Sequence, residues 1–399
     1  MSNHTLILSV RIAHINLKSI GIYLKTVEGK NNQEFPKGKI NHMGPQLLLR
    51  RGLMFKGFKF TITNLAILIS LIFLFDGKSV NAETKLIFNN FAPAKSSPAK
   101  GFVFPFQKKL SEISGMEISV MVPPASLAPA KKQWEMVKKG VADIGFSNTS
   151  FLRNRLKLPQ ISRIPFTTIS ASSATFALME THKKYFASAN EYKGMKLLGL
   201  WAYPAYQFHS TKNEILKVSD LKGMKLHVVP GPTKKIAGLL NATIVTGPTV
   251  KIFELISGKT VDGALIPNLA VIPFKYARYL KSVTNIPGGL GSNSMAAFMN
   301  KKVWDGLSGK HKKFVSQAAS FSQANMGRVM DNINKRAGKE LAKHKVKVNM
   351  ASESFTKQLK KVLSPLKAQW LKDAKSRGVD GNLAFDYYIK TGKAAAAKM

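Results

Sequence analysis

Apolar residues follow two different spacings along most of the chain. Short continuous apolar runs, typical of buried strands, alternate with stretches in which apolar residues recur every three or four positions, as on one face of a helix. Strands are predicted at 85–90, 117–122, 142–146, 207–210, 224–229, 243–245, 261–266 and 294–299. Helices are predicted at 100–114, 131–139, 233–240 and 250–257. This alternation favours an α/β fold with mostly parallel sheets, whose ligands gather at the carboxyl ends of the strands.

The alternating pattern is interrupted near Trp201, and we therefore predict two lobes. Lobe I is expected to comprise 83–204 with 293–330, and lobe II 205–292 with 331–399. Between the two blocks runs the sequence LGLWAYPAY, which places three aromatic residues close together: Trp201, Tyr203 and Tyr206. Aromatic residues at such a crossing either pack in a core or line a wet cleft, because Tyr and Trp carry polar groups. We predict that they line a cleft.

The longest predicted helix covers residues 310–344, which contain no proline. Its apolar positions recur at helical spacing or multiples of it, at Phe314, Ala318, Phe321, Val329, Ile333, Ala337 and Leu341. At ~1.5 Å per residue a helix of this length spans about 50 Å, more than one lobe, so we expect it to contact both lobes. Further helices are predicted at 352–377 and 382–389, followed by a frayed tail at 394–399.

The front of the chain has the parts of a secretory signal peptide at 54–82: two lysines, the apolar run 65–75 and a short polar end. The apolar run is shorter than the ~20 residues that span a bilayer. We predict export to the periplasm and cleavage after Ala82, with an uncleaved anchor or an internal helix as the alternative. Because a signal peptide stands at the start of a protein, we expect translation to start at Met54 and residues 1–53 to be an upstream extension outside the fold.

The composition restricts the possible chemistry. The absence of cysteine excludes disulfides, zinc–thiolate sites and cysteine nucleophiles. The net charge is +40, and because residues 1–82 hold 11 of the 61 basic and 3 of the 21 acidic residues, the remainder keeps +32. Lysines are spread as pairs over most predicted helices, with no basic arm, which favours a solvated basic surface over a nucleic-acid interface. We expect no nucleic-acid partner.

Catalytic and metal-binding motifs are absent from the sequence. Gly258, Lys259 and Thr260 look like the end of a phosphate-binding loop, but Phe253 stands where that motif needs a glycine. The eight histidines show no metal-ligand spacing, and there is no H-E-x-x-H or G-x-S-x-G sequence. We therefore expect no enzyme activity, no catalytic residue, no metal and no cofactor.

Polar and aromatic residues in and after the predicted strands form a candidate ligand site. His227 lies in the apolar run 224–229, where a histidine is either a satisfied core residue or a ligand contact. The uncharged loops after 85–90 and 142–146 either form turns or contact the ligand. The candidate ligand-binding residues are Asn90, Phe91, Asn148, Thr149, Trp201, Tyr203, Tyr206, His227, Thr249 and Asn268.

Five segments resemble, in order, those of the solute-binding proteins of tripartite ATP-independent periplasmic (TRAP) transporters. They are 134–145 (WEMVKKGVADIG), 220–226 (DLKGMKL), 261–264 (VDGA), 276–284 (YARYLKSVT) and 298–304 (FMNKKVW). The resemblance implies a two-lobed periplasmic-binding-protein fold with crossing hinge strands and a long helix touching both lobes. It also implies closure over a small solute that is handed to a membrane permease, and we expect a monomer.

Three places depart from that family's pattern. His227 stands where members usually carry an arginine that pairs with the solute's carboxylate. Tyr206 stands where a second arginine often lies. The segment after the VDG sequence is often polar in the family, whereas here 265–268 is apolar except for its last residue. A histidine here titrates near pH 6.5 unless its surroundings shift it. These exchanges favour a monocarboxylate, an aromatic acid or a neutral polar solute over a C4-dicarboxylate. A secreted scaffold or interaction protein of the same fold is the alternative.

Overall fold

The computed structural model describes residues 83–229 and 231–399. The upstream extension predicted at 1–53 and the signal peptide predicted at 54–82 lie outside the described residues. Within the described stretches, no helix combines the length and the hydrophobicity that crossing a membrane requires.

Lobe I is built on a sheet that is covered on both faces. Because successive side chains of a strand point to opposite faces, Ala297 and Met299 join one hydrophobic cluster, and Ala296 and Phe298 join the other. The strands, in spatial order, are β2 (Ile118–Met121), β1 (Thr84–Ile87), β3 (Ile144–Asn148), β10 (Ser294–Asn300) and β4 (Met195–Ala202), with β10 antiparallel to both its neighbours. The helices of this lobe are α3 (Phe104–Ile113), α4 (Gln133–Lys138), α5 (Ala171–Thr181) and α9 (Lys301–Gly306).

Lobe II holds a six-stranded sheet in which three neighbouring strands are parallel. The strands, in spatial order, are β11 (Lys347–Met350), β9 (Ser282–Asn285), β5 (Tyr206–Ser210), β8 (Gly263–Pro267), β6 (Lys225–Val228) and β7 (Thr243–Thr246). β6, β7 and β8 run in parallel, whereas β5 is antiparallel to β8 and β9. Its helices are α6 (Pro232–Leu239), α7 (Ile252–Ser257) and α8 (Val271–Phe274). The carboxyl ends of the parallel strands therefore share one edge, and Thr249 and Asn268 follow it in the chain.

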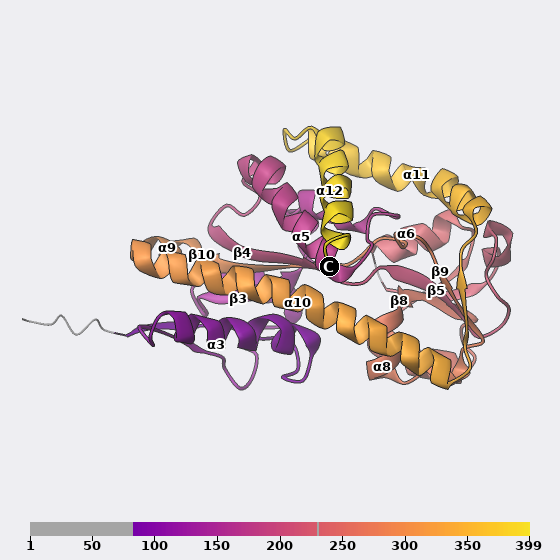
Figure 1. The fold of residues 1–399 in the computed structure, drawn as a ribbon, viewed down its shortest axis with the longest axis horizontal. Coiled ribbons are helices and arrows are strands. Elements are labelled where there is room, and N and C mark those ends of the chain that lie inside the picture. The colour runs from indigo at the N-terminus through magenta and orange to yellow at the C-terminus, as the bar shows by residue number, and fades with distance from the viewer. Residues whose placement is uncertain (1–82, 230) are drawn as a thin grey trace, which may run out of the picture. The chain divides into compact units, whose positions relative to one another are not determined.

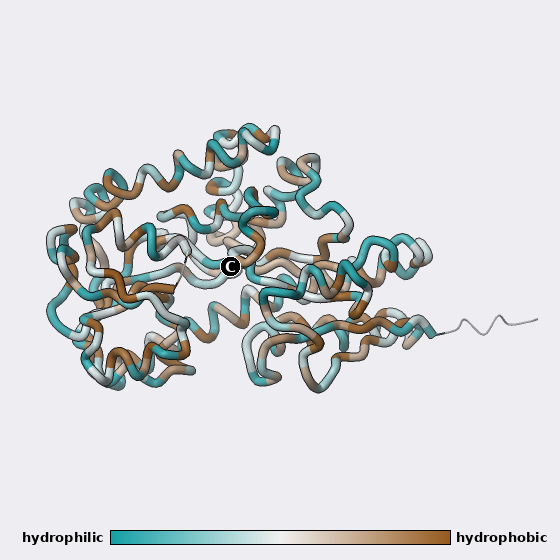
Figure 2. Tube along the Cα trace, turned by 180° about the vertical axis from the view of Figure 1, so that it is seen from behind, coloured by the Kyte–Doolittle hydropathy of each residue, from teal (hydrophilic) through white to brown (hydrophobic). Residues whose placement is uncertain are grey.

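The long predicted helix is confirmed as α10 (Gly309–Lys343), which runs along both lobes (Figure 1). Met326 and Met330 pack in the core of lobe I, and Ala337 and Leu341 pack in the core of lobe II. Figure 2 shows hydrophobic and hydrophilic residues alternating along this helix and the other outer helices, as their sequence periodicity predicts. One rigid element thus contributes to both cores.

A second helix, α11 (Glu353–Lys375), also passes from lobe II to lobe I (Figure 1). Phe355 and Leu359 pack in the core of lobe II, whereas Trp370 packs in the core of lobe I together with α12 (Gly381–Ala396). The assignment of all of 331–399 to lobe II is therefore wrong for its end. Periodicity identifies the buried face of a helix, but it does not identify the lobe against which that face is buried.

The structure differs from the sequence-based expectation at two other places. Helix α5 was not predicted, because its sequence ASSATFALMET is rich in Ser and Thr, which compete for backbone hydrogen bonds. It nevertheless begins with a capping box in which Ser170 and Ser173 each bond the other's backbone N–H. The tail expected to fray is helical to Ala396, because Ala395 is buried.

The lobes are joined by two segments that cross side by side, 203–206 and 290–293. The backbone N–H of Tyr203 donates to the carbonyl oxygen of Asn293 at 2.8 Å, and that of Tyr206 donates to Gly291 at 2.9 Å. Gly291 has φ +80°, and a Cβ there would clash with the backbone oxygen of Arg163. The hinge therefore depends on a glycine that lets the chain around Arg163 approach it.

Asp331 of α10 caps α5 from outside that helix. Its two carboxylate oxygens accept the N–H groups of Ala171 at 2.7 Å and Ser172 at 2.9 Å. We expect Asp331→Ala to lower the free energy of unfolding by about 1–2 kcal/mol, because two N–H groups of the first turn lose their partner. Chemical denaturation measures the change. The exposed Asp386→Ala is the control, and an equal effect of both variants would contradict a capping role.

Candidate functional site

The candidate site is centred on a buried arginine, Arg163, which is only 8% exposed. Its Nη2 donates to the amide oxygen of Asn293 at 2.7 Å and to that of Asn148 at 3.1 Å, while its Nε has no hydrogen-bond partner. Burial lowers the pKa of Arg163 to about 10, so the guanidinium is still charged at neutral pH. Among the ion pairs of the described residues, none involves Arg163.

The two amides beside Arg163 turn their oxygens toward it, and the oxygen of Asn148 also accepts the backbone N–H and the hydroxyl of Ser150. Because the guanidinium is a pure donor, it binds the oxygen of each amide and turns the nitrogen of each away. The amide nitrogens of Asn148 and Asn293 have no hydrogen-bond partner among the described residues, and both side chains are half-buried. This part of the site therefore presents a positive charge and unpaired N–H groups, which suits an anionic or acceptor-rich ligand.

The two hinge tyrosines lie at the same place. The backbone of Tyr203 pairs with that of Asn293. Burial raises the pKa of the Tyr206 phenol, and the positive charge of Arg163 opposes part of that rise. Burial also raises the pKa of the Tyr203 phenol. Both hydroxyl groups are therefore neutral at physiological pH and can donate or accept hydrogen bonds.

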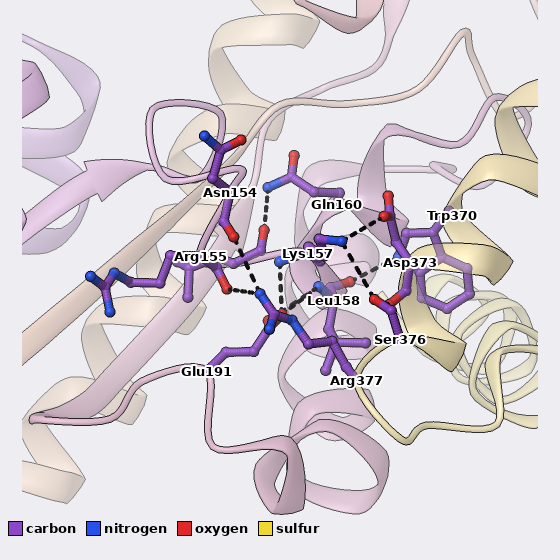
Figure 3. Close-up of polar contacts among 11 residues, drawn as sticks. Asn154, Arg155, Lys157, Leu158, Gln160, Glu191, Trp370, Asp373, Ser376 and Arg377 are labelled. Carbon is purple, nitrogen blue, oxygen red and sulfur yellow. Dashed lines mark hydrogen bonds and ion pairs between the residues drawn. The ribbon is translucent and has the colours of Figure 1, made fainter.

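The segment that carries Arg163 is held by the C-terminal part of the chain (Figure 3). Arg377 Nε donates to Glu191 at 3.0 Å, and Glu191 in turn accepts the backbone N–H of Lys157 at 2.8 Å. Trp370 Nε1 donates to the carbonyl oxygen of Leu158 at 3.2 Å. These contacts fix the chain five and six residues before Arg163 and so help to position its side chain.

A second polar network lies in lobe II and includes Asn268. His209 Nε2 lies 2.9 Å from the amide oxygen of Asn268, and the hydroxyl of Tyr276 lies 3.1 Å from His209 Nδ1. Asn268 Nδ2 donates to the amide oxygen of Asn285 at 2.8 Å. Burial lowers the pKa of His209 to about 4, so the ring is neutral at pH 7. Asn268 is half-buried, and its neighbour Pro267 pairs with Tyr206 in the sheet.

His227 and Thr249 lie elsewhere on the same edge of lobe II. His227 is 1% exposed, and neither ring nitrogen has a hydrogen-bond partner of good geometry. Burial lowers its pKa, so the expected titration near pH 6.5 is shifted to more acidic pH and the ring is neutral at pH 7. Thr249 is half-buried at the start of a short 3-10 helix after β7. No hydrogen bond in the described part of the chain joins either residue to the Arg163 group.

Two of the candidate residues belong to the core. Trp201, predicted to line the cleft, is fully buried and stacks on Phe102 with ring centroids 4.8 Å apart, because β4 extends to Ala202 and turns its ring into lobe I. Thr149 is also fully buried, and its hydroxyl lies 2.8 Å from that of Ser294. These two side chains therefore pack or bond within lobe I in this structure.

Two candidates follow strand β1. Asn90 is half-buried and its amide oxygen accepts the N–H of Ala92 at 3.1 Å, which is a turn contact. Phe91 is half-buried and stacks on Phe146 with ring centroids 4.6 Å apart. Phe91 and Tyr203 both pack against the same hydrophobic cluster of lobe I.

Arg163 is absent from the residues predicted from the sequence. The sequence around it could have identified it, because Arg163 is the only charged residue between Lys157 and Glu180. A lone arginine in an uncharged stretch of this length is expected either to be buried with hydrogen-bond partners or to bind a ligand. At the two places where the family usually has an arginine, this chain has His227 and Tyr206.

A separate hollow of about 430 Å³ lies on lobe I and shares no residue with the Arg163 group. It is lined by Met179, His182, Lys183, Ala187, Asn190, Glu191, Tyr192, Lys196 and Leu197. Lys196 lies near the start of β4 and the hinge tyrosine Tyr203 follows the end of that strand, so the hollow and the Arg163 group are at opposite ends of β4. The volume alone therefore does not mark the candidate site.

Comparison with known proteins identifies relatives over most of the chain. The model of the family DctP, bacterial extracellular solute-binding protein, family 7, matches residues 88–373. The outer membrane transporter protein TsaT of Comamonas testosteroni is 33% identical over 304 residues, which are 76% of this chain and 90% of that protein.

Solved structures share the fold. A TRAP periplasmic solute-binding protein of Bordetella bronchiseptica with bound mandelate is 22% identical, with a TM-score of 0.70 over 78% of this chain and 99% of that one. A marine metagenome TRAP solute-binding protein specific for aromatic acid ligands, in complex with 3-hydroxybenzoate, is 25% identical, with a TM-score of 0.67 over 78% of this chain and 99% of that one. The resemblance seen in the sequence is thereby confirmed, and the chain belongs to the bacterial extracellular solute-binding proteins of family 7.

Proposed function

We propose that this protein is a periplasmic receptor that binds a small organic acid between its lobes and delivers it to a TRAP membrane permease. The mature protein starts after Ala82 and works as a monomer. The solute is a monocarboxylate or an aromatic acid, and the protein has no catalytic role. The solute contacts are the candidate residues other than Trp201 and Thr149, namely Asn90, Phe91, Asn148, Tyr203, Tyr206, His227, Thr249 and Asn268, together with Arg163 and Asn293.

The observation that carries this proposal is the buried guanidinium of Arg163, which has no acidic partner among the described residues. A buried charge is costly unless it is paired, and amide oxygens compensate only part of that cost. A solute carboxylate would supply the missing charge, and Arg163 Nε has no partner yet. Arginine is suited to this role because its planar donor fork matches a carboxylate.

The relatives support the same class of solute. The Bordetella protein holds mandelate and the marine metagenome protein holds 3-hydroxybenzoate, and both ligands are aromatic monocarboxylates. In this chain Tyr203 and Tyr206 belong to the hinge and Phe91 packs against the same cluster of lobe I as Tyr203, so these rings could contact an apolar ligand body. One charged residue beside neutral groups favours a single carboxylate over two.

We expect Arg163→Met to weaken the binding of aromatic monocarboxylates by a factor of 100 or more, because the only buried cation of the group is lost. Isothermal titration calorimetry with mandelate and 3-hydroxybenzoate measures the effect. Arg328→Met, which removes an exposed arginine of α10, is the matched control and should bind like the parent protein. If the Arg163 variant folds and binds as tightly as the parent, Arg163 is not the carboxylate site. Micromolar affinity of the parent for succinate would contradict the monocarboxylate assignment.

We expect the dissociation constant to change less than about twofold between pH 6.5 and 8.5. Burial lowers the pKa of His209 to about 4 and also lowers that of His227 from its ordinary value, so both rings favour the neutral form in this range, and Arg163 stays charged. Calorimetry at several pH values, in buffers of different ionisation enthalpy, tests this. A dissociation constant that changes tenfold per pH unit would show that a proton is taken up or released with the solute.

A further inference from the structure

We infer that the solute carries, besides its carboxylate, a second and uncharged hydrogen-bond acceptor, such as a hydroxyl or keto oxygen, that Asn268 of lobe II receives. This inference rests on the proposed function and names the class of solute more closely. It is drawn from the hydrogen-bond network of lobe II, in which His209, Tyr276 and Asn285 fix the orientation of Asn268.

The donor and acceptor roles in this network follow from its chemistry. An amide oxygen can only accept, so the contact of 2.9 Å between Asn268 Oδ1 and His209 Nε2 requires a hydrogen on Nε2. In a neutral ring, Nδ1 is then an acceptor, and the hydroxyl of Tyr276 donates to it at 3.1 Å. Tyr276 and His209 are both fully buried, so no solvent competes for these bonds. The network thus holds the amide oxygen of Asn268 toward His209.

The amide nitrogen of Asn268 is consequently left with one unused hydrogen. One of its two N–H groups donates to Asn285 Oδ1 at 2.8 Å, and the other has no hydrogen-bond partner among the described residues. Asn268 as a residue is half-buried rather than sealed in the core, and under this inference the solute meets this second hydrogen. Asn268 therefore offers one donor of fixed direction, while its oxygen faces the buried ring of His209.

This donor lies where the lobes meet. Asn268 directly follows Pro267, which pairs with Tyr206, and the backbone of Tyr206 pairs with Gly291, which lies against the backbone of Arg163. The next residue, Leu269, packs against the cluster of lobe I that also includes Tyr203. A ligand whose carboxylate binds Arg163 can therefore extend toward Asn268.

The second group of the ligand must be uncharged. The groups that contact Asn268 are a neutral histidine and a second amide, and no lysine or arginine forms a hydrogen bond or ion pair with them in the described residues. A second carboxylate would lose its hydration without gaining a cation, which is unfavourable. A hydroxyl or keto oxygen needs one donor, which Asn268 supplies.

The experiment compares acids that differ by one hydroxyl group. Calorimetry gives the ratio of dissociation constants for phenylacetate against mandelate and for benzoate against 3-hydroxybenzoate. We expect the parent protein to prefer the hydroxylated acid by a factor of 10 or more in at least one pair, since a buried donor left unpaired penalises the acid without the hydroxyl. Asn268→Leu should bring that ratio near 1 while changing the affinity for the unsubstituted acid only a few-fold.

The role of His209 as a positioning residue is tested by two variants. His209→Gln keeps an N–H group that can donate to Asn268 and should keep most of the hydroxyl preference, whereas His209→Leu should lose it. The ratio of affinities, unlike the melting temperature, would not change if His209 were important for stability alone. A parent protein that binds both acids of each pair equally, or an Asn268→Leu variant that keeps the full preference, would overturn the inference and leave the carboxylate site intact. If no acid binds the parent protein, the proposed function fails and the inference fails with it.

Discussion

The buried positive charge of Arg163 is the constraint on which the rest of the candidate site depends. A guanidinium in a low-dielectric interior needs acceptors on all sides, and this one has two amide oxygens and no acid among the described residues. It binds the oxygens of Asn293 and, together with Ser150, of Asn148, and this orientation gives the surface that the two amides form its donor character. The hinge is built to fit it, since Gly291 and Ser292 lie against the backbone of residues 162 and 163. The site and the hinge are therefore one structural unit.

The connections between the lobes lie mainly in two helices and two crossing segments. α10 enters both cores as a straight run without proline, whereas α11 has Pro365 between its two groups of anchoring residues. Pro365 cannot bond the carbonyl oxygen of Lys361, and the hydroxyl of Ser364 donates to that oxygen at 2.9 Å instead. The end of α11 is then fixed on lobe I by Trp370 and by the ion pair of Arg377 with Glu191. α11 thus links the core of lobe II to the segment that carries Arg163.

The sequence was sufficient for the fold and insufficient for the site. The alternation of strands and helices and the 35-residue apolar pattern of α10 are periodic features, and they predicted the two lobes and the helix that joins them. Whether Trp201 lines a cleft or fills a core depends on the strand register, which a single sequence does not specify when both faces of the strand are covered. The path of α11 depends on tertiary packing in the same way. Arg163 could have been found as an isolated charge in an uncharged stretch, but its amide partners come from segments 15 and 130 residues away.

The position of the cation also bears on how such a receptor would act. In the family pattern the expected arginines belong to the strand with His227 and the hinge segment with Tyr206, whereas here the only buried cation of the group is on lobe I. Under the proposed function, lobe I alone could capture the carboxylate, since Arg163, Asn148 and Asn293 already form a connected group. Lobe II would then add neutral contacts through Asn268 and His227, each too weak to hold a solute alone. With such a division, the charge on lobe I would set most of the affinity. Selectivity would depend on whether lobe II can close without leaving its hydrogen-bond donors unpaired.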